Sequence, residues 1–272
     1  MSSLDANAIR DAIGRGAAGR LAGFEAFAEI ESTNSHLMRG AAPAVGKLHV
    51  ALTDNQTAGR GRHGRRWVSP AGSGLALSLA YTYARVPPQL PALTLAIGLG
   101  VIDALEDAGI GGLQLKWPND VMAGEGKLGG ILTETQMQGG DAVMVVTGVG
   151  LNVDLPDKLD LGAGQERAAA DIAGLVPVLP SCDELAAALI DRLCTVLVRY
   201  EAAGFASFAE RWSRFDWLRG RALTIDTRER TVSGTAVGVH SDGALLVDTG
   251  AADVHRVTSG TVVVAGGPEA GP

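Results

Sequence analysis

Apolar residues recur at helical spacing in four parts of the chain, which are separated by glycines and polar turns. From Leu93 to Leu105 they fall on one face of a predicted helix, and a group of glycines follows. Further along, Ser181 and Glu184 have the spacing of a capping box, and apolar positions continue from there towards Gly204. Helices are therefore predicted over residues 4–13, 93–107, 181–204 and 205–218.

A second pattern, rich in β-branched residues and broken by Gly-containing turns, occupies the middle and the end of the chain. In the middle it predicts strands over residues 113–115, 128–135 and 142–153. Near the end it predicts short strands around residues 222–226, 231–239, 244–248 and 254–257, a number typical of a small barrel. We expect residues 1–218 to form the main domain, 219–265 a small β-barrel and 266–272 a disordered tail.

Composition narrows the class of protein. Of 272 residues, 46% are hydrophobic and 19% charged, which suits a soluble globular protein. No apolar run reaches the roughly 20 residues of a bilayer span, and no basic start followed by an apolar stretch indicates a signal peptide, so we expect no membrane association and a cytoplasmic location. Cys182 and Cys194 fall in one predicted helix and are interpreted as ordinary helix residues. The net charge of −7 disfavours bulk binding of nucleic acid.

The segment 54–67 concentrates four arginines and three glycines. Glycines let backbone N–H groups approach a ligand, and guanidinium groups offer paired donors to carboxylate or phosphate oxygens. This combination suits a loop that closes over an acyl phosphate. A solvated basic loop and a contact with nucleic acid are the two alternatives that composition leaves open.

A second cluster, Lys116-Trp117-Pro118-Asn119-Asp120, precedes Lys127, a lysine that enters an apolar strand. Beside a buried sheet, Lys127 could hold a carboxylate and an α-phosphate together, while Asn119 and Asp120 could bind Mg²⁺ associated with phosphate. The alternative is an ordinary Pro-Asn-Asp turn and a surface lysine.

Two shorter motifs complete the candidates. Ser32, Thr33 and Asn34 stand between a predicted strand and a predicted helix, where they could cap the helix and also contact a neutral polar ring. Gly148 and Gly150 precede Asn152 at the end of a strand, where the carboxamide could face a nucleotide.

In their order along the chain, these motifs resemble those of the biotin protein ligase family. The likeness covers about residues 30–153 and is weaker through the C-terminal strands. It rests on the following segments: Ser32-Thr33-Asn34, Gln56-Thr57-Ala58-Gly59-Arg60-Gly61-Arg62-His63-Gly64-Arg65, Trp67-Val68-Ser69-Pro70, Lys116-Trp117-Pro118-Asn119-Asp120, Lys127-Leu128-Gly129-Gly130-Ile131-Leu132 and Gly148-Val149-Gly150-Leu151-Asn152.

The resemblance implies an α+β fold, a mixed sheet flanked by helices as in class II aminoacyl-tRNA synthetases, followed by a small C-terminal β-barrel. It implies catalytic roles for Lys127 and Arg62. It implies biotin contacts from Ser32, Thr33, Asn34, Gln56, Arg60, Gly61, Arg62 and Lys127. It implies ATP or adenylate contacts from Arg60, Arg62, Trp67, Lys116, Asn119 and Asn152, and a magnesium contact from Asp120.

The same resemblance implies an enzyme that uses biotin, ATP and Mg²⁺ and transfers biotin to a lysine of a biotin carboxyl carrier protein. Some family members carry a winged helix of about sixty residues before the Ser-Thr-Asn motif. Only about thirty residues precede Ser32 here, so we expect no sequence-specific DNA binding. A lipoate ligase is the nearest alternative, because it shares the fold but needs a longer apolar tunnel.

Overall fold

A mixed seven-stranded sheet forms the centre of the computed structural model, which describes residues 4–156, 169–227, 229–250 and 254–265. The strand order is β1-β2-β3-β7-β6-β5-β4. β1 and β2 are parallel and the other neighbours are antiparallel, which confirms the predicted mixed sheet. The strands are β1 (Leu21–Phe27), β2 (Leu48–Thr53), β3 (Gly74–Tyr83), β4 (Leu113–Lys116), β5 (Asp120–Ala123), β6 (Gly126–Met137) and β7 (Val143–Asn152).

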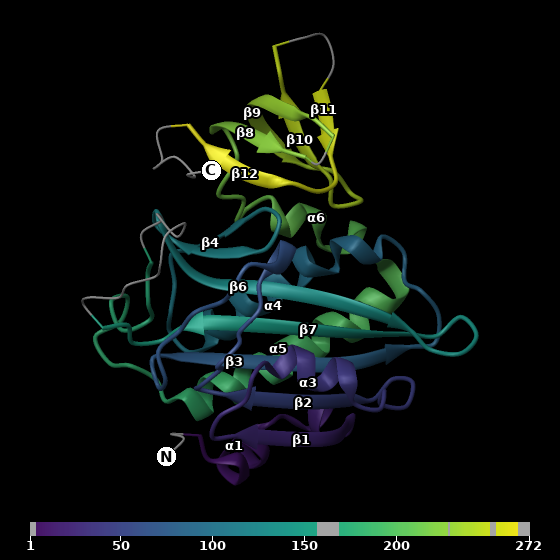
Figure 1. The fold of residues 1–272 in the computed structure, drawn as a ribbon, viewed down its shortest axis with the longest axis vertical. Helices are drawn as coiled ribbons and strands as arrows, with labels where there is room; N and C mark the ends of the chain where they lie inside the picture. Colours follow the sequence, from purple (N-terminus) through teal and green to yellow (C-terminus); the bar gives the residue numbers. More distant parts are fainter. Residues whose placement is uncertain (1–3, 157–168, 228, 251–253, 266–272) are drawn as a thin grey trace.

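Helices cover both faces of this sheet (Figure 1). On one face α4 (Leu93–Asp107) packs against α5 (Cys182–Ala203), with α1 (Ala6–Ala12) and α2 (Arg15–Ala18) against α5. The two long helices approach closely at Gly100, which has no side chain. A Cβ at this position would lie only 2.9 Å from Cγ2 of Val196. The predicted capping box at the start of α5 is confirmed.

The short helix α3 (Thr33–Arg39) lies on the opposite face. Its Leu37 packs with Ala51, Ala80, Met144 and Val146, whereas their neighbours along the strands belong to the core under α4 and α5. Because successive strand residues point to opposite faces, this alternation places α3 across the sheet from the long helices. Burial on both faces explains why all ten residues of β3 are buried.

A second, smaller sheet follows at the C-terminal end, above β4 and α6 in Figure 1. Its five strands are all antiparallel, in the order β11-β10-β9-β8-β12, and they form the small β domain where a barrel was predicted. Among the described strands, no pairing joins β11 to β12. The strands are β8 (Ala222–Asp226), β9 (Thr231–Val239), β10 (Leu245–Asp248), β11 (Val254–Val257) and β12 (Thr261–Val264).

One turn of this second sheet packs against the first. The indole Nε1 of Trp117 donates a buried hydrogen bond of 3.0 Å to the carbonyl oxygen of Gly243. Gly243 has φ of 88°, a conformation that favours glycine, and a Cβ there would collide with Ala92. The turn at Ser241-Asp242-Gly243 is therefore a contact point between the C-terminal sheet and the main domain.

The prediction of one helix over residues 205–218 is wrong. Helix α6 (Ala206–Trp212) ends early, because the chain after it turns to pair with the edge strand β4. The N–H of Leu115 donates to the carbonyl of Phe215 at 2.7 Å, and the N–H of Trp217 donates to the carbonyl of Leu115 at 3.0 Å. The first helix is also shorter than predicted, since the Asp5 side chain caps it at residue 6. The predicted tail, residues 266–272, lies outside the described residues.

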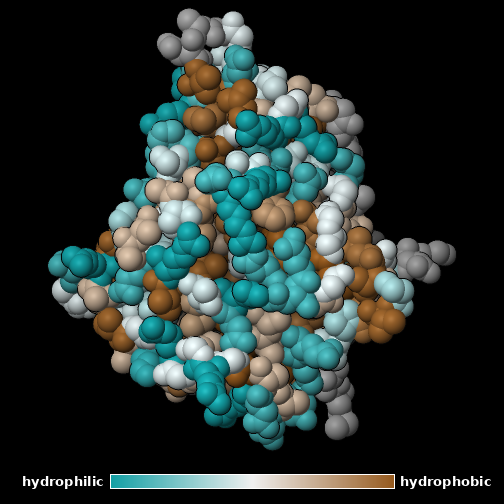
Figure 2. Space-filling model, turned by 180° about the vertical axis from the view of Figure 1, so that it is seen from behind, coloured by the Kyte–Doolittle hydropathy of each residue, from teal (hydrophilic) through white to brown (hydrophobic). Residues whose placement is uncertain are grey.

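The surface seen from behind is mostly hydrophilic, with separate hydrophobic patches (Figure 2). Within the described ranges, no helix combines the length and the apolarity needed to cross a bilayer.

Candidate functional site

The polar motifs of the sequence gather on the face of the large sheet that carries α3. Here Trp67 lies directly on the sheet, at the end of the segment 54–67, which we call the Gly-Arg loop. A Cβ at Gly150 would be 2.7 Å from Cε2 of its indole, and a Cβ at Gly130 would be 3.3 Å from Cζ3. Since Gly130 and Gly150 are paired across β6 and β7, they form a flat seat that only glycine provides.

The start of α3 forms one side of the site. Ser32 is the N-cap residue, and its Oγ accepts a hydrogen bond of 3.3 Å from the N–H of Ser35. The N–H of Thr33 donates to Oε1 of Gln56 at 2.9 Å. Thr33 is thus brought beside Gln56, and Ser32 caps the helix, while the predicted biotin contacts of all three residues remain predictions.

Asn34 is buried in the same turn, and both ends of its amide have protein partners. Its Oδ1 accepts from Oγ of Ser78 at 2.6 Å, and its Nδ2 donates to the carbonyl of Leu132 at 3.2 Å and to Oε2 of Glu134 at 3.1 Å. A Cβ at Gly148 would collide with Oδ1 of Asn34. The sequence analysis missed Ser78 and Glu134. Ser78 is a single polar residue among apolar strand neighbours, whereas Glu134 stands between two threonines at the polar end of β6.

The Gly-Arg loop forms a tight hairpin above this turn. The N–H of Gly61 donates to the carbonyl of Arg65 at 2.8 Å, and the N–H of Trp67 donates to the carbonyl of Gly59 at 3.0 Å. No Cβ fits at Gly59, because it would meet the carbonyl oxygen of Trp67. Arg60 reaches β6, where its guanidinium forms an ion pair of 2.8 Å with Glu134.

Lys127 pairs with a carboxylate at the centre of the site, and the charge of that carboxylate also acts on Arg62. Nζ of Lys127 is 2.6 Å from Oδ1 of Asp120 and 5.5 Å from the centre of the Trp67 ring, a cation–π distance. Partial burial lowers the pKa of Arg62, while the charge of Asp120 acts in the opposite direction. An arginine remains protonated under such conditions, so the site holds positive charge for an anionic ligand.

Asn119 and Asn152 hold the backbone on either side of this centre. Nδ2 of Asn119 donates to the carbonyl of Ile131 at 3.1 Å. Nδ2 of Asn152 donates to the carbonyls of Lys127 and Ala170 at 3.2 and 3.0 Å. These bonds fix strand β6, which carries Lys127. The predicted nucleotide contacts of Asn119 and Asn152 remain predictions.

Lys116 lies at the edge of the site, on β4. Its Nζ is buried without a hydrogen-bond partner in the part of the chain that the structure describes, and it is 5.3 Å from the centre of the Trp217 ring. Arg221 lies over the same indole at 3.7 Å. A buried ammonium without an acceptor suits the oxygen of an anion. The sequence analysis missed Trp217, which both cations contact.

Comparison with known proteins finds relatives of both parts of the chain. Residues 27–152 match the Biotin/lipoate A/B protein ligase family, and residues 219–264 match the Biotin protein ligase C terminal domain. A biotin–[acetyl-CoA-carboxylase] ligase of Mycobacterium tuberculosis is 35% identical over 277 residues, a match that covers 96% of this chain and 95% of the relative. The chain belongs to the biotin protein ligase family.

Other biotin protein ligases are similar over most of the chain. The bifunctional ligase/repressor BirA of Escherichia coli is 32% identical, over 80% of this chain and 67% of its own. The structure of a biotin protein ligase from Aquifex aeolicus in complex with biotin and ATP has a TM-score of 0.71 and 26% identity, and the match covers 89% of this chain and 98% of that one.

For the predicted magnesium contact, the site offers the single carboxylate of Asp120. Among the described residues, no group of three or more His, Cys, Asp or Glu side chains could hold a metal ion. Asp120 supplies a single carboxylate, which is shared with Lys127. Mg²⁺ at nucleotide sites usually takes one or two carboxylates, water and phosphate oxygens. The residues therefore fit a Mg²⁺ that arrives with the nucleotide, and not a resident metal.

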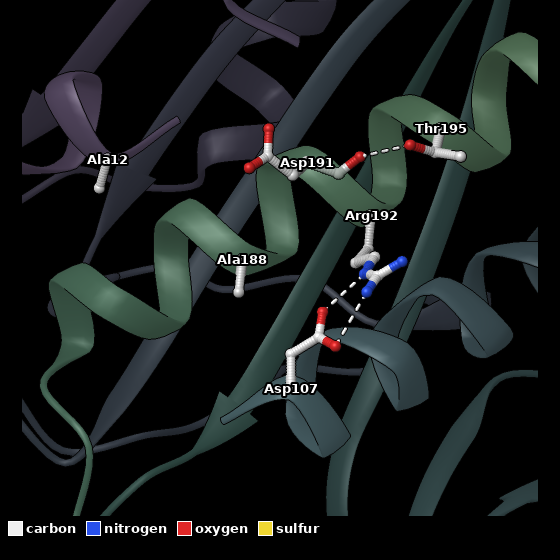
Figure 3. A pocket seen from close by; sticks show the side chains of 6 residues that line it. All are labelled: Ala12, Asp107, Ala188, Asp191, Arg192 and Thr195. Carbon is white, nitrogen blue, oxygen red and sulfur yellow. Dashed lines mark hydrogen bonds and ion pairs between the residues drawn. The ribbon is translucent and has the colours of Figure 1, made fainter. Parts of the chain in front are cut away.

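A surface groove elsewhere on this biotin protein ligase has a volume of about 400 Å³ but is not a second candidate for the site (Figure 3). It lies among α1, α4 and α5, on the side of the long helices. Its charged groups are already paired: Arg192 binds Asp107 through two bonds of 2.6 and 2.8 Å, and Asp191 accepts from the N–H of Gly14. Such satisfied groups leave little for a ligand.

Proposed function

We propose that this chain activates biotin with ATP and attaches it to one lysine of a biotin carboxyl carrier protein. The observation that supports this most directly is the position of Lys127 against Asp120 and the face of Trp67, on the face of the sheet that carries the polar turn at Ser32 and Thr33. A carboxylic acid with a neutral polar ring would place its ring at the turn and its carboxylate at the cations. Biotin is such an acid, and the match to a C-terminal domain specific to biotin ligases favours it over lipoate.

In the first step, a carboxylate oxygen of biotin attacks the α-phosphorus of ATP. The new O–P bond forms as the bond to pyrophosphate breaks, which gives biotinyl adenylate. Two anions must approach each other, so Lys127 and Arg62 act by neutralising their charge and by positioning them. Mg²⁺ would neutralise phosphate oxygens, with Asp120 as its protein ligand. Lys116, with its buried ammonium, would bind the nucleotide's phosphates.

In the second step, the neutral amine of the acceptor lysine attacks the acyl carbon of the adenylate. The C–N bond forms, AMP leaves with both electrons of the C–O bond, and the nitrogen loses one proton to solvent. Trp67 and the loop above the glycine seat would shield the mixed anhydride from water until the acceptor docks. All substrates of this reaction occur in the cytoplasm, where we place the activity.

Incubation of the protein with biotin, MgATP and a carrier domain tests this proposal. Pyrophosphate should be released, and mass spectrometry should find biotin on a single lysine of the carrier. Parallel reactions with lipoate and without ATP are the controls. No transfer with biotin, or transfer with lipoate alone, would refute the proposed function.

A further inference from the structure

Glu134 on β6 joins two parts of the site that are far apart in the sequence. Its Oε1 accepts from Arg60 at 2.8 Å, and its Oε2 accepts from Arg60 at 3.1 Å and from Nδ2 of Asn34 at 3.1 Å. One carboxylate therefore binds the Gly-Arg loop and the first turn of α3 at once. Its side chain is only 22% exposed, so this contact is partly protected from solvent.

The contact between Glu134 and Asn34 belongs to a continuous chain of hydrogen bonds, in which each donor and acceptor can be assigned. A carboxylate only accepts, so it must face the NH₂ of Asn34, which leaves Oδ1 of Asn34 to accept from Ser78 at 2.6 Å. Ser78 has one proton, so Thr33 must be the donor in the 2.7 Å contact between their hydroxyls. Thr33 donates its backbone N–H to Gln56 at 2.9 Å.

This chain begins and ends in the same loop. It runs from Arg60 to Gln56 through four residues, and the last link is the backbone N–H of Thr33, whose hydroxyl also lies 3.3 Å from the same oxygen of Gln56. The four intermediate residues are Glu134, Asn34, Ser78 and Thr33. The first arm of the hairpin is thus attached to the start of α3 at two positions, Gln56 directly and Arg60 through Glu134.

We propose that Glu134 is a positioning residue that anchors the Gly-Arg loop to the pocket, and that Arg60 is the partner through which it acts. Both terminal nitrogens of Arg60 are bound to the carboxylate, so its charge is neutralised within the protein. Arg62, on which the charge of Asp120 acts, is then the arginine of the loop left for the ligand's anion. Both amide protons of Asn34 are also donated within the protein, so a contact of its side chain with the ring would be made through Oδ1, which has one acceptor position left beside Ser78. This inference rests on the proposed function.

Trypsin offers a test that needs no ligand, because the loop contains cleavable arginines. In Glu134→Gln, the bidentate ion pair is lost while the side chain keeps its size. We expect cleavage after Arg62, Arg65 or Arg66 to become about five- to tenfold faster, as for the loss of a charge-assisted pair that is partly exposed. Arg60→Lys keeps the charge but loses the paired geometry, and should have a similar effect.

A second readout is the rate at which biotinyl adenylate leaves the enzyme. It should rise by a similar factor in each single variant, and the double variant Arg60→Lys/Glu134→Gln should be no worse than either, because both changes break one contact. The matched control is Asp103→Asn. Asp103 forms a bidentate pair with Arg211 whose side-chain exposures, 20% and 44%, are close to the 22% and 46% of Glu134 and Arg60.

The proposal that Glu134 anchors the loop would be overturned by unchanged cleavage in Glu134→Gln. Additive effects in the double variant, or an equal increase in Asp103→Asn, would also overturn it. If the wild type forms no biotinyl adenylate, the proposed function fails instead, and the ligand-free trypsin experiment still decides whether Glu134 anchors the loop.

Discussion

The position of the Lys127 ammonium is fixed by the groups that surround it. Its ammonium lies between Asp120 and the face of Trp67, and its strand is held by Asn152. A flexible surface lysine would have no such constraints. The alternative interpretation of this residue as an ordinary surface lysine is therefore less compatible with the structure than a role at the centre of the site.

Replacing Lys127 with alanine should lower the rate of adenylate formation on the order of ten- to a hundredfold, because one charge-assisted contact contributes about 1.5 to 3 kcal/mol. Pyrophosphate release measures this rate. The control is Lys47→Ala, since Lys47 is a lysine whose Nζ binds only the carbonyl of Gly19 on the surface. A rate for Lys127→Ala close to that of the control would exclude Lys127 from the chemistry.

Asp216 should make the stability of the protein depend on pH. Burial raises the pKa of this carboxyl from 3.8 to about 6. Between these values the folded state keeps a proton that the unfolded state has released, so the free energy of unfolding falls as pH rises from about 4 to 6 and is level above that. The decrease is of the order of 3 kcal/mol.

Chemical denaturation between pH 4 and 7 measures this dependence. Asp216→Asn removes the titrating group while its Oδ1 can still accept from the N–H of Leu218, so the downward slope should disappear. Asp248→Asn, a change at an exposed aspartate, should keep the slope of the wild type. An identical slope in Asp216→Asn and the wild type would mean that another group is responsible.

At the scale of elements, paired strands supply the flat surface on which the loop rests. In Gly150→Ala the new Cβ would lie 2.7 Å from the indole of Trp67, which must shift and carry the loop with it. Overpacking of this kind costs about 1 to 3 kcal/mol. We expect slower adenylate formation, with the fold retained, whereas Gly139→Ala, where a Cβ meets nothing within 4 Å, should behave like the wild type in both assays.

The elements also show what the sequence could predict. Helix α4 has the bounds that its apolar periodicity indicated, because that pattern is local. Strands β2 and β3 escaped notice, since strands buried on both faces lack alternation. Strand β5 was hidden because Asp120 was interpreted as part of a turn.

The same limit applies to the site. The clustered motifs pointed to Lys127, Arg60 and Gln56 because polar residues stood together in the sequence. Ser78 and Glu134 act through partners 44 and 100 positions away, and only the pairing of strands brings them to Asn34. In a single sequence, a polar residue within a strand does not indicate which distant residue it will contact.

At the scale of the whole molecule, Trp117 links the C-terminal sheet to the part of the site where we propose that the nucleotide binds. Trp117→Phe removes the donor to Gly243 and leaves a buried carbonyl without its partner, a loss of about 1 to 3 kcal/mol. Because Lys116 and Asn119 flank this residue, we expect the KM for ATP to rise several-fold more than the KM for biotin. Trp212→Phe is the control, since the Nε1 of Trp212 has no hydrogen-bond partner among the described residues. Equal changes in both KM values would argue against the link.

The seat of Trp67 also gives the molecule an intrinsic optical signal. Of its four tryptophans, three are buried, with exposures of 2% for Trp117, 1% for Trp212 and 6% for Trp217. Their emission should form a background of short wavelength that biotin alone leaves unchanged, although a nucleotide bound at Lys116 would also reach Trp217. Trp67 instead lies under the loop with an ammonium near its ring, so a ligand that displaces Lys127 or excludes water changes its surroundings first. Fluorescence could therefore follow loop closure in real time in the unlabelled protein, and Trp67→Phe would remove the signal while leaving the background in place.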